Sequence, residues 1–258
     1  MYPFINLGET KIYMTGVGIL LAALTFLLVA AYRCRKYNLV YRRIFYRSPI
    51  AIIVMYVLGS YLDFMLQGNI IPTNGNELLW LITPYGYKFH FVGIAIGGVL
   101  SIRYFLKNIA RIENRKLYID VLFFSLAGAT IPLGLFLLLG DDVIGKWTSG
   151  WLGVQALHID SELNKFNAVY PVGLFIAIRG ILSYAGTLIA KHIQKINGIG
   201  FVWFAALFIG RSIIFLFQLY PRYGVISFGN YILDIKQYVC VLLALMSLYT
   251  YYQRRDQI

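Results

Sequence analysis

Seven long apolar runs, separated by short connections, constrain the fold of this chain more than any other feature. A helix needs about 20 apolar residues to cross a hydrocarbon core of roughly 30 Å. The composition agrees with such a solvent, since 59% of the residues are hydrophobic, 13% are charged and the mean hydropathy is +0.69. The sequence therefore predicts an all-α, polytopic integral membrane protein with seven transmembrane helices in a single transmembrane domain, residues 1–258. The predicted spans are Ile12–Tyr32, Pro49–Leu66, Phe89–Leu106, Ile119–Leu139, Pro171–Ala190, Gly200–Leu219 and Tyr231–Tyr251.

The basic residues follow every second span, which predicts the orientation of the chain. They are Arg33, Arg35, Lys36, Arg42, Arg43 and Arg47 after the first span, Lys107, Arg111, Arg115 and Lys116 after the third, Lys191 and Lys195 after the fifth, and Arg254 and Arg255 after the seventh. Basic loops stay on the cytoplasmic side, so the N-terminus is expected outside and the C-terminus in the cytoplasm. The net charge of +12 is explained by this topology, and no nucleic-acid partner is expected.

Two further features bear on processing and on cysteine chemistry. The first apolar run is too long for a cleaved signal peptide, and its positive charge follows it, so it is expected to remain as a signal anchor. Cys34 and Cys240 have no metal-binding spacing, and both are expected to be small, neutral, buried side chains. No metal or cofactor is expected.

Small residues and one long connection add detail to the predicted architecture. Gly93 and Gly97 lie four residues apart, which favours close helix packing. The outer segment at about 140–170 is the longest connection and is rich in aromatic and charged residues. Connections of this length are usually functional or disordered, and the aromatic content argues against disorder. We expect a short amphipathic helix or a re-entrant segment in the outer interface.

Ionisable residues at membrane depth are candidate functional residues, because charge facing lipid is costly. They are Asp63, His90, Asp141 and Asp142 towards the outer ends of spans, Arg179 within the fifth span and Arg211 deep in the sixth. A guanidinium can donate two parallel hydrogen bonds to a phosphate, so this set is suited to the headgroup of a lipid from the outer leaflet.

Each of these residues also has a structural interpretation. His90 could be an ordinary interface residue, and the two adjacent aspartates could end a helix. Arg179 could pair with a neighbouring carboxylate for assembly. Arg211 could be the ion-pair partner of Asp63 or Asp142.

Several segments match the motifs of one known family in order along the chain. Lys88-Phe89-His90 is similar to a Ser-Phe-His-Gly-Gly motif, and Tyr170–Phe175 to a His-Pro-x-Gln-Leu-Tyr motif. Gly140–Lys146 keeps two glycines of a Gly-Arg-(Ile/Leu)-Gly-Asn-Phe-Ile-Asn-Gly-Glu signature, and Gly210-Arg211 matches the family's Arg-Ile-Ile segment. In these motifs the chain resembles the bacterial prolipoprotein diacylglyceryl transferases, which are seven-span enzymes of the inner membrane.

The resemblance implies an activity, partners and a site. The family transfers diacylglyceryl from phosphatidylglycerol to the cysteine thiol of a lipoprotein precursor, so the expected partners are an anionic phospholipid and such a precursor. The implied catalytic residues are His90, Arg211 and Asp141, with Arg211 on the phosphate and His90, oriented by Asp141 or Asp142, as general base. The residues implied in lipid binding are Arg211, His90, Asp142, Gly140 and Gly145.

The chain departs from the family at several positions, which keeps other functions open. The signature arginine, asparagine and glutamate correspond to Leu138, Asp141 and Lys146. The Gln and Tyr of the fifth-span motif correspond to Gly173 and Phe175. A non-catalytic relative that binds phospholipid or lipoprotein is the main alternative. A small transporter or channel is the third, and the lack of an internal repeat argues against it.

Overall fold

The computed structural model describes residues 4–7, 10–66, 91–107, 112–140, 145–155, 168–194, 200–217, 225–228 and 231–255. The chain divides into two compact units. One contains Met1–Tyr37 and Lys116–Ile258, and the other contains Asn38–Arg115. The predicted single transmembrane domain stays a prediction.

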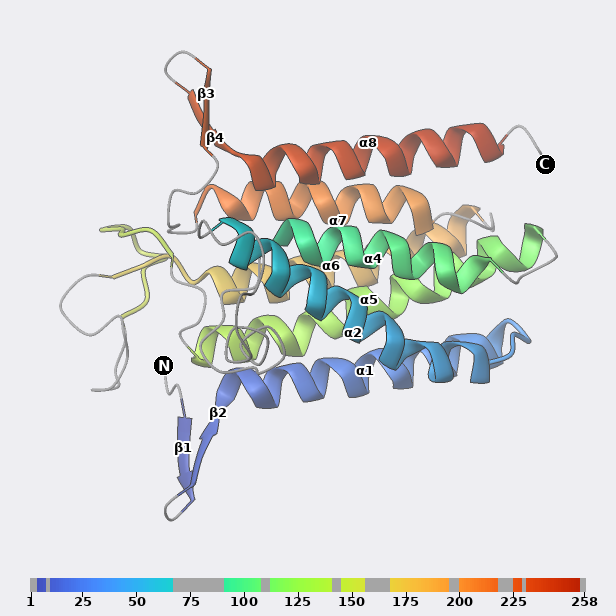
Figure 1. Ribbon diagram of the computed structural model, residues 1–258, viewed down its shortest axis with the longest axis horizontal. Helices are drawn as coiled ribbons and strands as arrows, with labels where there is room; N and C mark the ends of the chain where they lie inside the picture. The colour runs from blue at the N-terminus through green and yellow to red at the C-terminus, as the bar shows by residue number, and fades with distance from the viewer. Residues whose placement is uncertain are drawn as a thin grey trace. The chain divides into compact units, whose positions relative to one another are not determined.

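Seven α-helices are present among the described residues, and each overlaps one predicted span. Their bounds are α1 Met14–Lys36, α2 Arg42–Leu66, α4 Phe91–Leu106, α5 Ile112–Gly140, α6 Val172–Gln194, α7 Gly200–Phe215 and α8 Ile235–Arg255 (Figure 1). Four of them (α1, α2, α5 and α6) are long and apolar enough to cross a membrane. Shorter apolar stretches occupy Ile96–Leu106 in α4 and Ala205–Phe215 in α7. The all-α class is therefore confirmed, and the four long apolar helices are compatible with an integral membrane protein. The number of spans and the orientation stay predictions.

Five helices, α1, α2, α5, α6 and α8, extend beyond the predicted apolar runs, and the first two show why. The first run was expected to end at Tyr32, but α1 continues to Lys36 and carries three basic residues in its last turn. The second was expected to begin at Pro49, but α2 begins at Arg42 and contains that proline. Apolar composition predicts where lipid begins, not where the helix ends. Cations are favourable near a helix C-terminus, so the helical hydrogen bonds of α1 continue past the apolar region.

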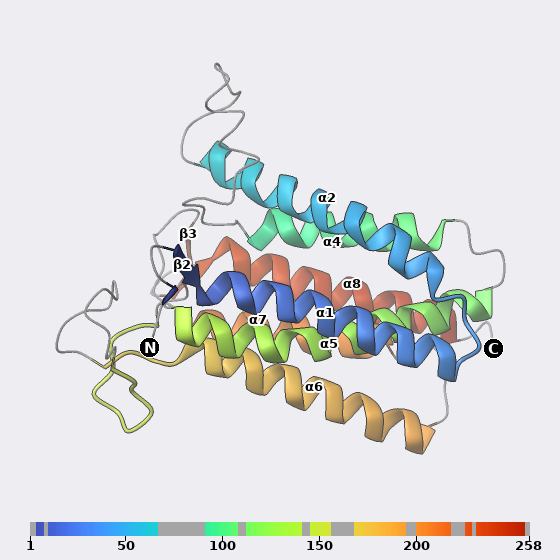
Figure 2. The same cartoon turned by 90° about the horizontal axis from the view of Figure 1, so that it is seen from below.

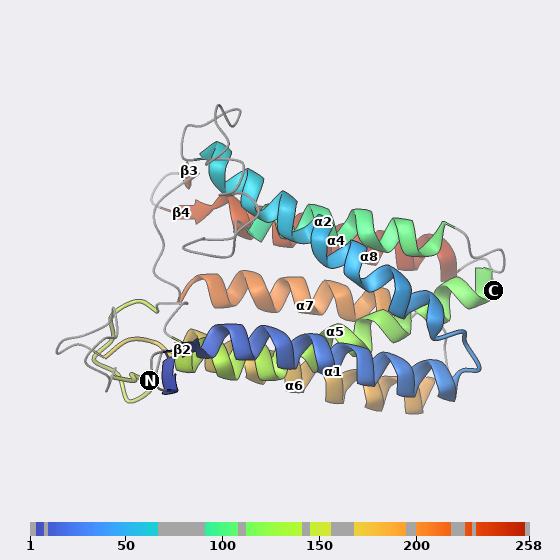
Figure 3. The same ribbon diagram turned by 60° about the horizontal axis from the view of Figure 1, so that its bottom comes forward.

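Two β-hairpins lie where continuous helix or loop was expected. β1 (Phe4–Leu7) pairs with β2 (Thr10–Tyr13), and β3 (Val225–Phe228) pairs with β4 (Tyr231–Asp234), both antiparallel. The predicted seventh span is wrong over its first four residues, which form β4, and α8 begins only at Ile235. Within the first unit, Figures 1 and 3 show both hairpins at the same end of the helices. Their β-branched and aromatic residues favour strands and are also apolar, so hydropathy alone does not separate them from a span.

The described part of the connection between α5 and α6, residues 145–155 and 168–171, contains no helix. The expected short amphipathic helix or re-entrant segment stays a prediction, because the rest of the connection lies outside the described residues. Isolated bridges join Trp147 and Val154 to Val169. Val154 N donates to Val169 O at 2.9 Å, and Val169 N donates to Val154 O at 3.1 Å. The sequence Thr-Ser-Gly-Trp-Leu-Gly over residues 148–153 is rich in residues that favour turns over helix interior.

The second unit is a closely packed pair of helices, α2 and α4, which lie side by side in Figures 2 and 3. A Cβ on Gly93 would overlap the backbone carbonyl of Leu58, and one on Gly97 would lie 2.7 Å from the Cα of Met55. The predicted packing role of these two glycines is confirmed. Arg47 Nη1 donates to the carbonyl oxygens of Tyr104 and Phe105 at 3.2 and 3.0 Å, so α2 also caps the C-terminal end of α4.

In the first unit, α5 is the most enclosed helix. All eight residues from Tyr118 to Ser125 are buried, as expected for a helix that is apolar around most of its circumference. Glycines allow its close contact with α6. A Cβ on Gly134 would overlap the backbone nitrogen of Ala177, and one on Gly173 would overlap that of Leu138. The backbones of α5 and α6 therefore touch, which fixes the register between the two helices.

Candidate functional site

Three of the predicted site residues, His90, Asp141 and Asp142, lie outside the described residues. The expected contact between the histidine and a carboxylate therefore stays a prediction. Asp63 belongs to α2, but its side chain is also outside the described part of the structure.

The two predicted glycines have defined positions. Gly140 is the last residue of α5. Gly145 is buried, and a Cβ there would overlap the carbonyl oxygen of Tyr170. The segments around Gly145 and Tyr170 are also joined by a hydrogen bond, in which Tyr170 N donates to Lys146 O at 3.0 Å. Glycine at 145 thus has a packing reason, independent of any bound lipid.

Arg179 of α6 and Arg211 of α7 form the main polar cluster within the apolar helices. The aliphatic part of the Arg179 side chain lies against Gly210, where a Cβ would be 3.1 Å from its Cδ. Arg179 Nη1 donates a long hydrogen bond of 3.4 Å to Leu207 O. The guanidinium carbon of Arg211 lies 4.4 Å from the centroid of the Phe215 ring, a cation–π contact. The missing side chain of Gly210 is what allows the Arg179 stem to lie against α7, one residue before Arg211.

The charges of this arginine pair repel one another. The predicted carboxylate partner of Arg179 is absent among the described residues, where its electrostatic neighbours are Arg211 and Cys240. Its Nε is buried and has no hydrogen-bond partner in that part of the chain. The Arg179 Nε thus leaves a donor for an anion in an apolar setting, and the neighbouring Arg211 adds a second positive charge.

Helix α8 is the third helix next to the arginine pair. Cys240 is fully buried, in agreement with the prediction for both cysteines, since Cys34 is also fully buried. Gln237 Nε2 donates to Ser212 O at 3.4 Å and so joins α8 to α7 one residue beyond Arg211. The packing of α7 on α8 is visible in Figure 1. Three helices thus fix the position of the two arginines.

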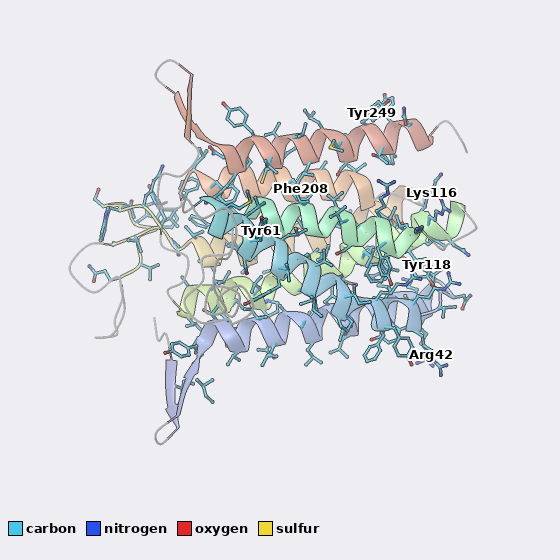
Figure 4. All side chains as sticks on the ribbon, in the orientation of Figure 1. Arg42, Tyr61, Lys116, Tyr118, Phe208 and Tyr249 are labelled. Carbon is cyan, nitrogen blue, oxygen red and sulfur yellow. The ribbon has the colours of Figure 1, made fainter. Side chains whose placement is uncertain are left out.

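A second polar cluster lies at the other end of the first unit. Arg33, expected in a basic loop, belongs to α1 and is only 4% exposed. Its guanidinium carbon lies 4.0 Å from the ring centroid of Phe124 and 5.9 Å from that of Tyr184. Figure 4 shows Lys116, also buried, near the beginning of α5, away from the hairpins. Aromatic faces attract a desolvated cation, so this arginine is a packing element between helices and not a topology signal in a loop.

Asp120 in the same region binds the beginning of α7. It is fully buried, and its Oδ1 accepts a hydrogen bond of 2.7 Å from Gly200 N. A carboxylate at a helix N-terminus satisfies a free N–H group and is stabilised by the helix dipole. Asp120 is therefore assigned to folding rather than to chemistry.

We expect Asp120→Ala to lower the free energy of unfolding by about 1–2 kcal/mol, because the Gly200 N–H loses its acceptor. The measurement is thermal unfolding of the purified protein in detergent. Asp120→Asn is the matched control, since it keeps an oxygen acceptor and should retain part of the stability. Equal losses in both variants would show that the charge, and not the hydrogen bond, matters.

Among the described residues, no group of three His, Cys, Asp or Glu side chains could hold a metal ion. The chemistry that the described site supports is the binding of an anion by two arginines. No model of a protein family matches the chain, and no curated protein is similar to it in sequence.

Proposed function

We propose that the chain is a lipid-dependent transferase of a bacterial plasma membrane. Its reaction is the transfer of diacylglyceryl from phosphatidylglycerol to the cysteine thiol of a lipoprotein precursor. The single observation that carries the proposal is the pairing of Arg179 with Arg211 between apolar helices. The phosphate of an anionic phospholipid neutralises this pair and receives bidentate hydrogen bonds from the guanidinium groups.

The charge balance of the reaction explains why two arginines are useful. The thiol sulfur attacks the glyceryl carbon, the C–S bond forms, and the C–O bond to the phosphate breaks with its electron pair on the leaving group. The thiol proton passes to His90, oriented by Asp141 or Asp142. The phosphate changes from a singly charged diester to a monoester that carries more negative charge. Two fixed cations bind that developing charge more strongly than the starting lipid, which is the requirement for catalysis.

The proposed topology has seven spans, with the N-terminus outside and the C-terminus in the cytoplasm. It is supported by the basic residues at the end of α1 and the beginning of α2, and by the overlap of every described helix with a predicted span. Reporter fusions at Asn38, Gly153 and Gln257 test it. A cytoplasmic signal is expected at the first and third sites and an external signal at Gly153. A cytoplasmic signal at Gly153 would contradict the proposed orientation.

A non-catalytic lipid-binding relative is the second candidate. It is favoured by Leu138, which stands where the family signature has an arginine. The backbone of Leu138 lies against Gly173 at the crossing of α5 and α6. The arginine pair alone would hold a lipid without promoting transfer.

Complementation distinguishes the two candidates. We expect the chain to restore growth to a strain depleted of its own diacylglyceryl transferase. The direct measurement is the mass of a lipobox peptide after incubation with the purified protein and phosphatidylglycerol, which should increase by one diacylglyceryl group. Membrane-inserted protein that binds phosphatidylglycerol but leaves the peptide mass unchanged would support the binding protein instead.

A further inference from the structure

The connection between α5 and α6 carries an exposed aromatic surface. It is formed by Trp147, Trp151 and Leu152, which we call the tryptophan surface. Their side chains are 52%, 91% and 40% exposed. Such a group of large apolar side chains in water is unfavourable and indicates a binding surface.

The backbone beneath this surface is held by the ends of two helices. Lys146 N donates to Phe217 O at 2.8 Å, directly after the end of α7. The Tyr170 ring packs against the Phe217 ring with centroids 5.2 Å apart, and α6 begins two residues later at Val172. Figures 1 and 2 show this connection beyond the ends of α5, α6 and α7. The tryptophan surface is therefore held at the level where these apolar helices end.

The chemistry of the surface selects the boundary between headgroups and acyl chains. Tryptophan has an apolar ring and one N–H donor, and it is enriched at this depth in membrane proteins. Lys146 is exposed next to Trp147 and can reach lipid phosphates with its ammonium group while its stem stays in an apolar layer. A water-filled surrounding would satisfy the lysine but leave the two indoles unfavourably hydrated.

We infer that the tryptophan surface inserts into the headgroup–acyl boundary of the leaflet that meets the ends of α6 and α7. In the proposed topology this is the outer leaflet. The partner is the lipid surface itself, and anchoring would hold the α5–α6 connection down on the bilayer. This inference does not depend on the transferase reaction.

Depth-dependent fluorescence quenching tests the inference. Wild-type protein and Trp151→Phe are reconstituted into vesicles of phosphatidylcholine and phosphatidylglycerol. Three sets of vesicles are compared: unlabelled lipid, lipid brominated near the carbonyl end of the acyl chain, and lipid brominated near the methyl end. The difference between the two proteins isolates the emission of Trp151. A third protein, Leu20→Trp in the Trp151→Phe background, provides a reference for the acyl region, because Leu20 is 72% exposed on α1.

We expect the Trp151 emission to be shifted to the blue and quenched more by bromine near the carbonyl end than near the methyl end. The Leu20→Trp emission should be quenched by bromine near the methyl end at least as strongly as by bromine near the carbonyl end. Emission from Trp151 at the wavelength of hydrated indole, with no quenching by either lipid, would overturn the inference. Blue-shifted emission without quenching by lipid would also overturn it, because protein and not lipid would then cover the surface. Trp151→Phe changes an exposed side chain, so both proteins should fold.

Discussion

In the proposed reaction, replacing Arg211 by glutamine is expected to reduce diacylglyceryl transfer about 100-fold or more, because the proposed site loses one of its two donors to the developing phosphate charge. Glutamine keeps a neutral N–H donor of shorter reach and removes the charge. The measurement is the rate of the mass increase of a lipobox peptide at saturating phosphatidylglycerol. Arg211→Lys should recover only part of the rate, since a lysine cannot donate two parallel hydrogen bonds.

The control for this prediction is a matched change at an exposed arginine. Arg43→Gln, at the beginning of α2, should leave the rate unchanged. The double variant Arg179→Gln/Arg211→Gln should lose less than the sum of the two single effects in free energy, because both arginines act on one phosphate in the proposed site. Strictly additive effects would place the two arginines in separate sites. An unchanged rate in Arg211→Gln with correct membrane insertion would remove this residue from the mechanism.

The repulsion between Arg179 and Arg211 makes a second property measurable without turnover. An anion that binds between like charges stabilises the folded protein through its binding free energy. Phosphatidylglycerol should therefore protect the protein against thermal unfolding more than phosphatidylcholine does. This comparison separates lipid binding from lipid transfer, which the rate alone does not.

The helical framework was predictable because lipid imposes a simple rule on sequence. A backbone in hydrocarbon must satisfy its own hydrogen bonds, so long apolar runs become helices. All seven described helices overlap the predicted runs, as this rule predicts. Helix ends were less predictable. Arg33 illustrates the difficulty, because a basic residue normally indicates a loop, whereas here Phe124 and Tyr184 hold its cation within the helix bundle.

The sequence contains a hairpin pattern before α8 that the hydropathy of the run does not reveal. Gly229 and Asn230 separate two four-residue segments rich in β-branched and aromatic residues, which is a typical hairpin pattern. The apolar residues of β4 run directly into α8, so the run was interpreted as one span. The connection between α5 and α6 shows the opposite case. Its aromatic residues correctly indicated a structured segment, but its glycines and hydroxyl residues favour bridged extended chain over helix.

The candidate site was predictable only residue by residue. Arg211 was identifiable because it lies deep in an apolar run, where a charged side chain is costly and is therefore a candidate functional residue. Its closeness to Arg179 depends on the register between α6 and α7, which is set by Gly210 and by the packing of neighbouring helices. No spacing within one helix encodes that register, so sequence alone suggested a carboxylate partner for Arg179.

Replacing Gly134 by leucine is expected to be among the most destabilising single changes in the described helices. Its Cβ would overlap the backbone nitrogen of Ala177 and lie 2.7 Å from Gly173 O, so α5 and α6 would have to separate. Backbone cannot move aside as a flexible side chain can. Overpacking of this kind costs about 3 kcal/mol or more, which corresponds to a decrease of about 10 °C in Tm for a chain of this size. The measurement is Tm in detergent, together with the yield of monodisperse protein.

Gly16→Leu is the matched control for this last prediction. Gly16 also lies in an apolar helix, α1, but a Cβ there would meet nothing within 4 Å. Leucine is the better helix former, by about 0.8 kcal/mol of helix propensity. This variant should therefore keep or slightly raise Tm. Gly134→Ala should already lower Tm, because the overlap begins at the Cβ atom itself. If alanine and leucine at 134 were both as well tolerated as leucine at 16, the close contact between α5 and α6 would be incorrect, and with it the register that positions Arg179.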